Sequence, residues 1–322
     1  MNRNRQVLRG LPQHSSFPSF LMLVLLIVVN AILQPTFFSY QVFKMNFMTF
    51  TPLILVSLAQ ATVILVGAVD LSIGAGISLV TVAMASLMGD SSLSILLVSL
   101  LGVGVALFLS LFNGFFIGFI GPPPLIMTFA TSTVWFGIAL LIMPTPGGYI
   151  PEAYYSLYGK SLGGFLPMPV LVLLIAIIFC LLLGRLRAFR HLYAVGGSEA
   201  AARASGIRVT ATKVFAFLVS GVFTALAALC VVGQTATGDA RSGQGFTLNS
   251  VAAAVIGGMA FSGGRGSYVG AIMGGIILGL LINIIYFANI TSFYQEFMKG
   301  VIIIIALLIG AVPRLRRSIS RR

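Results

Sequence analysis

Residues 169–187 read PVLVLLIAIIFCLLLGRLR. Sixteen apolar or small residues in a row are followed at once by arginines, and an uninterrupted apolar run of about this length is typical of a membrane-spanning helix. Such a run must be helical in lipid, because unpaired backbone N–H and C=O groups are too costly there. The arginines open a polar stretch, 185–213, whose cations are Arg185, Arg187, Arg190, Arg203, Arg208 and Lys213.

The rest of the chain repeats this pattern. Of its 322 residues 58% are hydrophobic and 8% are charged, and the mean hydropathy is +1.08. The composition predicts an all-α, polytopic transmembrane helical bundle. The net charge of +13 sits in short segments beside apolar runs, where the positive-inside rule expects it and where arginines contact anionic lipid. This distribution argues against nucleic acid as a partner. Cys180 and Cys230 lie inside apolar runs and are interpreted as small core residues.

Glycine, proline and polar residues interrupt the apolar sequence and divide the chain into spans. The first, about 17–34, is interpreted as a retained helix, although a cleaved signal peptide is the rival interpretation. Residues 35–46 are expected to be a polar connection, and Gly121 with Pro122 to Pro124 to stop the fourth span. The predicted spans are 17–34, 47–69, 71–89, a run that reaches 120, 125–143, 169–184, 214–233, a short piece at 249–261, a span to 288, and 297–312.

Charge predicts the orientation. If the short piece 249–261 crosses, there are about ten spans, and the basic stretch 185–213, Arg265 and both basic termini share the cytoplasmic side. The weakly charged, tyrosine-rich segment 144–168 then lies on the other side. The expected layout is a cytoplasmic tail (1–16), a permease domain (17–312) and a basic cytoplasmic tail (313–322).

A glycine-rich break surrounds Asp70. One reading places Asp70, with Ser72 and Gly74, beside a polar translocation path; the other makes Asp70 the N-cap of the next helix. Asn113, Asn249 and Asn283 either line such a path or bond a neighbouring helix. Gly67, Ser72, Gly74 and Gly76 recur 190 residues later as Gly257, Ser262, Gly264 and Gly266, a weak sign of internal repetition.

Residues 197–206 predict a short helix with a small, smooth surface. Ser198 is a candidate N-cap, Glu199 suits the positive helix end, and Gly206 is a candidate terminator. Such a surface favours docking against another protein; a linker helix on the membrane is the alternative. The surface includes Gly197, Ala200 and Ala201.

Three further patterns bear on function. Small-xxx-small spacings begin at Gly114, Gly270 and Gly275 and favour packing within one subunit. The apparent phosphate loops at 159–161 and 257–266 fail the Walker pattern, so ATP would have to be used by a partner. No catalytic constellation, metal-ligand spacing or cofactor motif is found.

Four ordered blocks resemble the permeases of ribose-type ABC importers. They are AVDLSIG (68–74), YAVGGSEAAA with SGI (193–202 and 205–207), AVIGG with SGGRG (254–258 and 262–266, within 249–266), and SFYQ with KG (292–295 and 299–300). The chain departs from the family pattern at Ala68 for Gly, Ser198 for Asn, and Met259-Ala260 for Thr.

The resemblance implies a multi-pass, non-catalytic permease of the bacterial cytoplasmic membrane. Two permease subunits, identical or related, would form the path. Two copies of an ATP-binding subunit would drive it, docked on residues 190–208, and an extracytoplasmic binding protein would deliver a monosaccharide or similar solute. The alternatives are a stand-alone secondary carrier or channel, for which only Asp70 is a plausible coupling group, and a membrane enzyme, which lacks catalytic residues.

Overall fold

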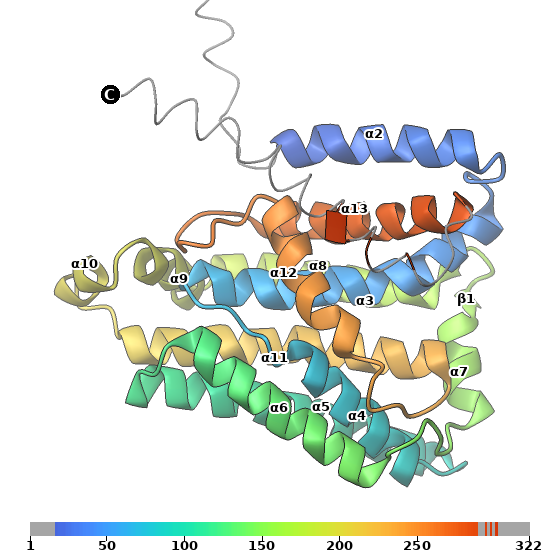
Figure 1. The fold of residues 1–322 in the computed structure, drawn as a ribbon, viewed down its shortest axis with the longest axis horizontal. Helices are drawn as coiled ribbons and strands as arrows, with labels where there is room; N and C mark the ends of the chain where they lie inside the picture. The colour runs from blue at the N-terminus through green and yellow to red at the C-terminus, as the bar shows by residue number, and fades with distance from the viewer. Residues whose placement is uncertain (1–16, 289–293, 295–296, 298–299, 302–322) are drawn as a thin grey trace, which may run out of the picture.

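A computed structural model describes residues 17–288, 294, 297, 300 and 301 (Figure 1). The predicted last span 297–312 lies mostly, and the tails 1–16 and 313–322 lie entirely, outside the described residues. The described elements are α2 (Phe17–Leu33), α3 (Tyr40–Leu65), α4 (Ile73–Leu87), α5 (Ser92–Phe115) with the π-helical turn η1 (Phe116–Ile120), α6 (Pro124–Ile142), α7 (Glu152–Gly159), β1 (Ser161–Leu162), β2 (Leu166–Pro167), α8 (Met168–Arg185), α9 (Arg187–Gly197), α10 (Glu199–Ala204), α11 (Val209–Thr235), α12 (Gln244–Ile256) and α13 (Tyr268–Phe287).

Most of these helices are long and apolar. Among the described residues, six are long and apolar enough to cross a membrane: α3, α5 with η1, α6, α8, α11 and α13. The helices α2, α4 and α12 are apolar but shorter. The all-α helical prediction is therefore confirmed. The expected polar connection at 35–46 is wrong in its second half, because the Ser39 side chain accepts a hydrogen bond from Val42 N and α3 begins at Tyr40.

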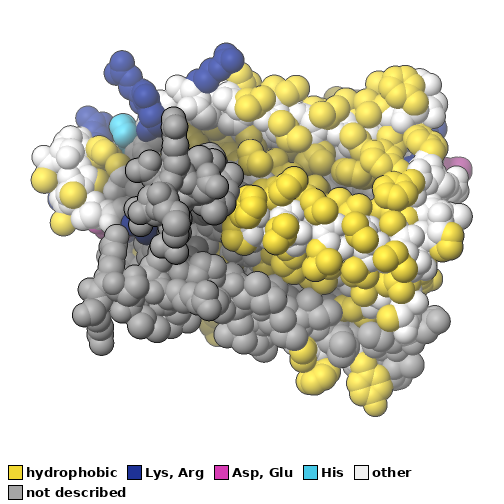
Figure 2. Space-filling view, turned by 90° about the horizontal axis from the view of Figure 1, so that it is seen from above, with side chains coloured by type: hydrophobic (Ala, Val, Ile, Leu, Met, Phe, Trp, Pro, Cys, Tyr) yellow, Lys and Arg dark blue, Asp and Glu magenta, His cyan; other side chains and the backbone are white. Residues whose placement is uncertain are grey.

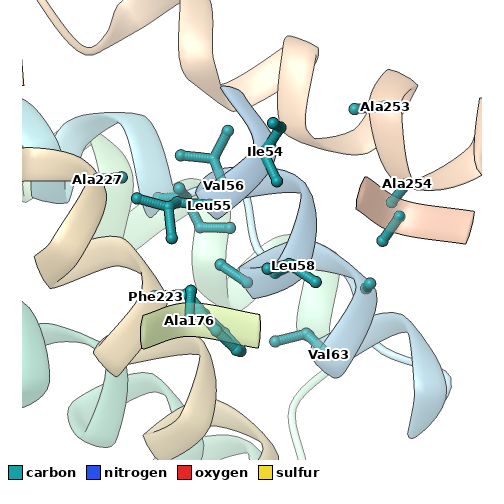
Figure 3. Packing of buried hydrophobic residues seen from close by; sticks show 14 of the residues in the cluster. Ile54, Leu55, Val56, Leu58, Val63, Ala176, Phe223, Ala227, Ala253 and Ala254 are labelled. Atoms are coloured by element: carbon teal, nitrogen blue, oxygen red, sulfur yellow. The ribbon is translucent and has the colours of Figure 1, made fainter. Parts of the chain in front are cut away.

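Helix α3 is the centre of the bundle. Every residue from Phe50 to Leu65 is buried, and α8, α11, α12 and α13 all pack against this helix. Figure 3 shows the side chains that meet there: Ile54, Leu55, Val56, Leu58 and Val63 of α3, Ala176 of α8, Phe223 and Ala227 of α11, and Ala253 and Ala254 of α12. Ser57 of α3 donates a hydrogen bond to Ala271 O of α13 within this core (2.8 Å).

The small-xxx-small spacings pack helices of one subunit together, as predicted. Gly275 and Gly279 lie against α3, where added β-carbons would come within 2.7 Å of Ile54 Cα and 2.3 Å of the Phe50 ring. Gly274 lies against the backbone of α12 in the same way, and Gly114 and Gly118 lie against α11. A β-carbon on Gly257, directly after α12, would lie 2.2 Å from Gly270 O. Because glycine has no side chain, the helix axes approach closely. The van der Waals packing at such contacts is one of the main attractions between helices in lipid.

The outer helices present large apolar side chains on their exposed faces. Those on α2, α5, α6 and α8 include Leu25, Leu97, Phe129 and Ile178, each more than half exposed. In Figure 2 hydrophobic side chains cover much of the described surface, while Lys and Arg gather at one end. An apolar surface of this extent is compatible with lipid and not with water.

The two ends of the bundle differ. One end carries α9, α10 and the loops 66–72 and 257–267; we call it the basic end (Figure 1). The other carries α7 and the antiparallel pair β1–β2, and we call it the tyrosine end. Cations outnumber acids at the basic end, where Arg185, Arg187, Arg190, Arg203, Arg208, Lys213 and Arg265 lie with Glu199 and Asp70. At the tyrosine end Lys44, Lys160 and Arg241 are balanced by Asp90, Glu152 and Asp239.

The segment around α12 connects these two ends. Before α12, Gly238 forms a backbone bridge with Gly147 at the tyrosine end. After α12, Gly264 N donates to Leu65 O (3.0 Å) at the basic end. The short apolar piece expected at 249–261 is thus a helix that begins earlier, at Gln244, and whose flanking residues reach opposite ends.

Candidate functional site

Two groups of predicted site residues can be placed. One is the surface formed by α9 and α10, and the other surrounds Asp70 in the loop between α3 and α4. Both lie toward the basic end of the bundle.

Helix α9 is amphipathic and lies on the bundle. Phe189, Leu192 and Val195 recur at helical spacing and are buried, while Arg187 and Arg190 are exposed. Burial of this apolar stripe holds the segment against the helices beneath it.

Helix α10 projects from the end of α9. Its N-cap is Ser198, as predicted, and the Ser198 side chain accepts a hydrogen bond from Ala201 N (3.2 Å). Gly206 adopts a φ of 79°, and the bonds Gly206 N to Arg203 O and Ile207 N to Ala202 O end the helix in a Schellman motif. The helix is short, and its surface is small and smooth: Ala202 is buried, whereas Glu199, Ala200, Ala201, Arg203 and Ala204 are exposed, as are Gly197 and Gly206.

Glu199 forms an ion pair with Lys213 of α11 (2.5 Å). The pair ties the start of α10 to the next helix, a role that the sequence analysis missed because the two residues are too far apart for an i,i+4 pair within one helix. Since the Glu199 side chain is 47% exposed, the pair adds little stability and mainly orients the loop.

Asp70 is fully buried in a hydrogen-bonded network. Ser72 donates to Asp70 Oδ1 from its backbone N (2.8 Å) and from its Oγ (2.6 Å). Asn113 of α5 donates to Ser72 Oγ (2.8 Å) and accepts from Thr131 Oγ1 of α6 (2.8 Å). The network therefore joins the α3–α4 loop to α5 and α6.

Two further side chains hold the same loop. With its amide oxygen turned toward Asp70 N, Gln60 of α3 bonds both backbone groups of Asp70 (3.0 and 3.2 Å). Thr128 of α6 accepts from Leu71 N and donates to Val69 O, each at 3.1 Å. Within the described residues Asp70 Oδ2 has no hydrogen-bond partner. The sequence analysis did not single out Gln60, Thr128 or Thr131. The feature that could have indicated them is a polar side chain inside an apolar span.

The N-cap reading of Asp70 is wrong, since Ser72 holds the N-cap position of α4. Asp70 instead braces the loop that precedes the helix. Gly74 marks a close contact within the bundle: a β-carbon there would lie 2.2 Å from Thr247 Oγ1 and 2.3 Å from Gly243 O.

The structure does not bring the remaining predicted path residues to this network. Asn249 is half-buried on α12. Asn283, half-buried on α13, donates to Asn46 Oδ1 of α3 (2.9 Å). Asp70, Ser72 and Asn113 thus form one cluster with Gly74 close by in sequence, and Asn249 and Asn283 belong to other elements.

The described residues contain no cluster of three or more His, Cys, Asp or Glu that could hold a metal ion. Cys180 and Cys230 are free and buried, in agreement with their interpretation as core residues.

A bundle of long apolar helices whose cations gather at one end is the architecture of a multi-pass membrane protein. Comparison of the sequence with known proteins agrees. The family described as "Branched-chain amino acid transport system / permease component" matches residues 42–307. The chain belongs to this family of permease components, which are not themselves catalytic.

Individual relatives are similar along nearly their whole length. The chain is 32% identical over 299 residues to the ribose import permease protein RbsC of Bacillus subtilis (strain 168), covering 90% of this chain and 91% of that protein. It is 30% identical over 297 residues to the D-allose transport system permease protein AlsC of Escherichia coli (strain K12), 90% of each. It is 29% identical over 309 residues to an autoinducer 2 import system permease protein LsrC of Yersinia enterocolitica, 94% of this chain and 84% of that protein. No solved structure is significantly similar to the chain.

Proposed function

We propose that this chain is the permease subunit of an ABC importer and forms the path for a monosaccharide or a similar small polar solute. The observation that carries the proposal is its similarity to ribose and D-allose permeases along nine-tenths of its length. The position of α10 on a cationic end supports it.

The proposed location is the bacterial cytoplasmic membrane, with the basic end and both termini in the cytoplasm. The excess of arginine at that end supports this orientation. With α12 counted as a crossing, α2, α3, α4, α5, α6, α8, α11, α12, α13 and the apolar run 297–312 make about ten spans. The domain layout is the one expected from the sequence: a tail at 1–16, the permease domain at 17–312 and a basic tail at 313–322.

The ATP-binding subunit docks on α10 in this proposal, through a surface made of Gly197, Ser198, Glu199, Ala200, Ala201 and Gly206. Exposed alanines suit a partner that closes over the helix, because they leave no long side chain to displace. An extracytoplasmic binding protein would meet the tyrosine end.

The path itself lies between this chain and a second permease subunit, either another copy or a related chain. Asn249 and Asn283 are proposed to line it. Both side chains are half-exposed, and a polar side chain is costly where it faces lipid. Asn283 also donates to Asn46 Oδ1 of α3, the bond to a neighbouring helix that was its alternative role. Gln244 and Gly245, exposed near Asn249, extend the polar face of α12. Asp70, Ser72, Gly74 and Asn113 have a different role, which is to brace the break between α3 and α4.

Reconstitution tests the proposal. The purified chain, with its ATP-binding partner and binding protein, is placed in proteoliposomes, and uptake of labelled ribose and D-allose is measured with and without ATP. Uptake that requires ATP and both partners is expected. Uptake by the chain alone that follows an ion gradient would instead establish the secondary carrier.

Docking is tested separately by co-purification from detergent. Ala200→Arg keeps a good helix former but adds bulk to the α10 surface, and we expect it to reduce recovery of the ATP-binding subunit. Ala153→Arg, an exposed alanine of α7 at the opposite end, is the matched control. Equal recovery with both variants would contradict the docking assignment. Glu199→Arg is a less specific test of docking, because it also breaks the ion pair with Lys213.

A further inference from the structure

At the basic end the backbones of three segments are in direct contact. They are the end of α9, the end of α3 and the loop 257–267. Gly264 N donates to Leu65 O (3.0 Å). A β-carbon on Gly196 would lie 1.9 Å from Leu65 O and 2.5 Å from Gly264 N, and one on Gly264 would lie 2.6 Å from Gly197 N. Only glycine permits these contacts.

Two more glycines, Gly263 and Gly67, extend the contact. A β-carbon on Gly263 would lie 2.8 Å from Gly67 N and 2.8 Å from Gly196 O. We call Gly67, Gly196, Gly263 and Gly264 the glycine junction. It brings the loop between α3 and α4 and the loop between α12 and α13 against the same turn of α9.

These two loops begin in the same way. Helix α3 ends with Gly67 at a φ of 76° and the bonds Gly67 N to Ile64 O and Ala68 N to Val63 O. Helix α12 ends with Gly258 at a φ of 93° and the bonds Gly258 N to Val255 O and Met259 N to Ala254 O. Both are Schellman motifs. Gly67 therefore corresponds to Gly258, one position beyond the pairing with Gly257 that sequence alone suggested.

A second layer of side chains links the same elements. Tyr193 of α9 donates to Gly266 O (3.2 Å), and the Phe189 ring lies 5.1 Å from the ring of Tyr268, the first residue of α13. The Tyr268 hydroxyl bonds Thr62 Oγ1 of α3 (2.8 Å). Helix α9 is thus connected to both α3 and α13.

We propose that the glycine junction transmits displacement of α9 and α10 to both loops at once, so that α4 and α13 move together when the docked partner moves. The inference rests on the proposed function. Gly196 and Gly264 are positioning residues in it. Their contacts are backbone to backbone and leave no side chain that could change rotamer and absorb the movement, and a close-packed contact of this kind passes displacement on.

Gly196→Ala tests the inference in proteoliposomes that contain the complete transporter. Solute uptake, ATP hydrolysis and recovery of the ATP-binding subunit are measured together. We expect the ATP-binding subunit to be retained and solute uptake per ATP hydrolysed to fall roughly tenfold. Gly184→Ala is the matched control, because Gly184 lies in the last turn of α8 at the same end and its β-carbon would meet nothing within 4 Å.

Tyr193→Phe is the variant to use if Gly196→Ala does not assemble. It adds no volume and removes only the bond to Gly266 O, so we expect an assembled transporter whose uptake per ATP falls roughly twofold. If the Gly196→Ala transporter assembles and its solute uptake per ATP hydrolysed equals that of the wild type, the inference is overturned. If Gly196→Ala does not assemble, a wild-type ratio in Tyr193→Phe overturns the inference. Failure of the proposed function is distinct, since the wild-type chain would then show no ATP-dependent uptake.

Discussion

Asn113→Leu should destabilise the bundle through the Asp70 network. The substitution keeps the branched shape of the side chain, although leucine is larger, and removes two hydrogen bonds, one to Ser72 Oγ and one from Thr131 Oγ1. Ser72 keeps its bonds to Asp70, and Thr131 Oγ1 is within reach of Met127 O and Thr128 O (3.1 Å each), so no donor is left without an acceptor. With about 0.6 to 1 kcal/mol for each lost bond in a membrane protein, the expected loss of unfolding free energy is about 1–2 kcal/mol.

The only tryptophan of the chain provides the assay. Trp135 of α6 lies edge-on to Phe112 of α5 at 5.5 Å, so its fluorescence reports separation of these helices during titration with a denaturing detergent. Ser132→Ala is the control on the same helix, because Ser132 is half-buried and its hydroxyl donates to Phe129 O of its own helix. An Asn113→Leu midpoint indistinguishable from that of Ser132→Ala would refute the network as a source of stability.

Three other substitutions have defined outcomes. Gly279→Ala should cost about 1–3 kcal/mol in the same titration, because its β-carbon would lie 2.3 Å from the Phe50 ring, whereas Gly104→Ala, with open space, should cost nothing. Ser198→Ala should remove about 1 kcal/mol from α10 and speed tryptic cleavage of the loop, which peptide mapping would detect; an unchanged rate would show that the cap is dispensable. Asp70→Asn keeps the acceptor for Ser72 but puts an amide NH2 group where Oδ2 has no partner among the described residues, so stability should fall by about 1–3 kcal/mol; unchanged stability would show that an acceptor lies within reach of that position.

The spans could be predicted because composition decides them. The predicted run 169–184 is α8 with two added residues, and the expected stop at Gly121 coincides with the end of η1 at Ile120. The predicted boundaries were wrong where a capping residue or a polar first turn extended a helix beyond its apolar run. Helix α3 begins at Tyr40 because Ser39 caps it, and α12 begins at Gln244, ahead of the apolar stretch that revealed it.

The local geometry of α10 could be predicted as well, since Ser198 and Gly206 act within a few residues of themselves. The network at Asp70 could not. It depends on Asn113 and Thr131, which meet only because α5 and α6 pack beside the same loop. Nothing in the spacing of these residues encodes that contact, and the same holds for Gln60 on α3.

Glycine serves different purposes in the middle of the bundle and at its basic end. Within α13, Gly275 and Gly279 bring the helix onto α3 and make the middle of the bundle rigid. At the basic end Gly67 and Gly258 end α3 and α12 instead, and the chain turns there in a left-handed conformation that most residues avoid. The same residue type therefore stiffens the membrane-embedded part and creates short turns beneath α9. If the ATP-binding subunit docks on α10, as proposed, force applied there would reach those turns before it reached the core.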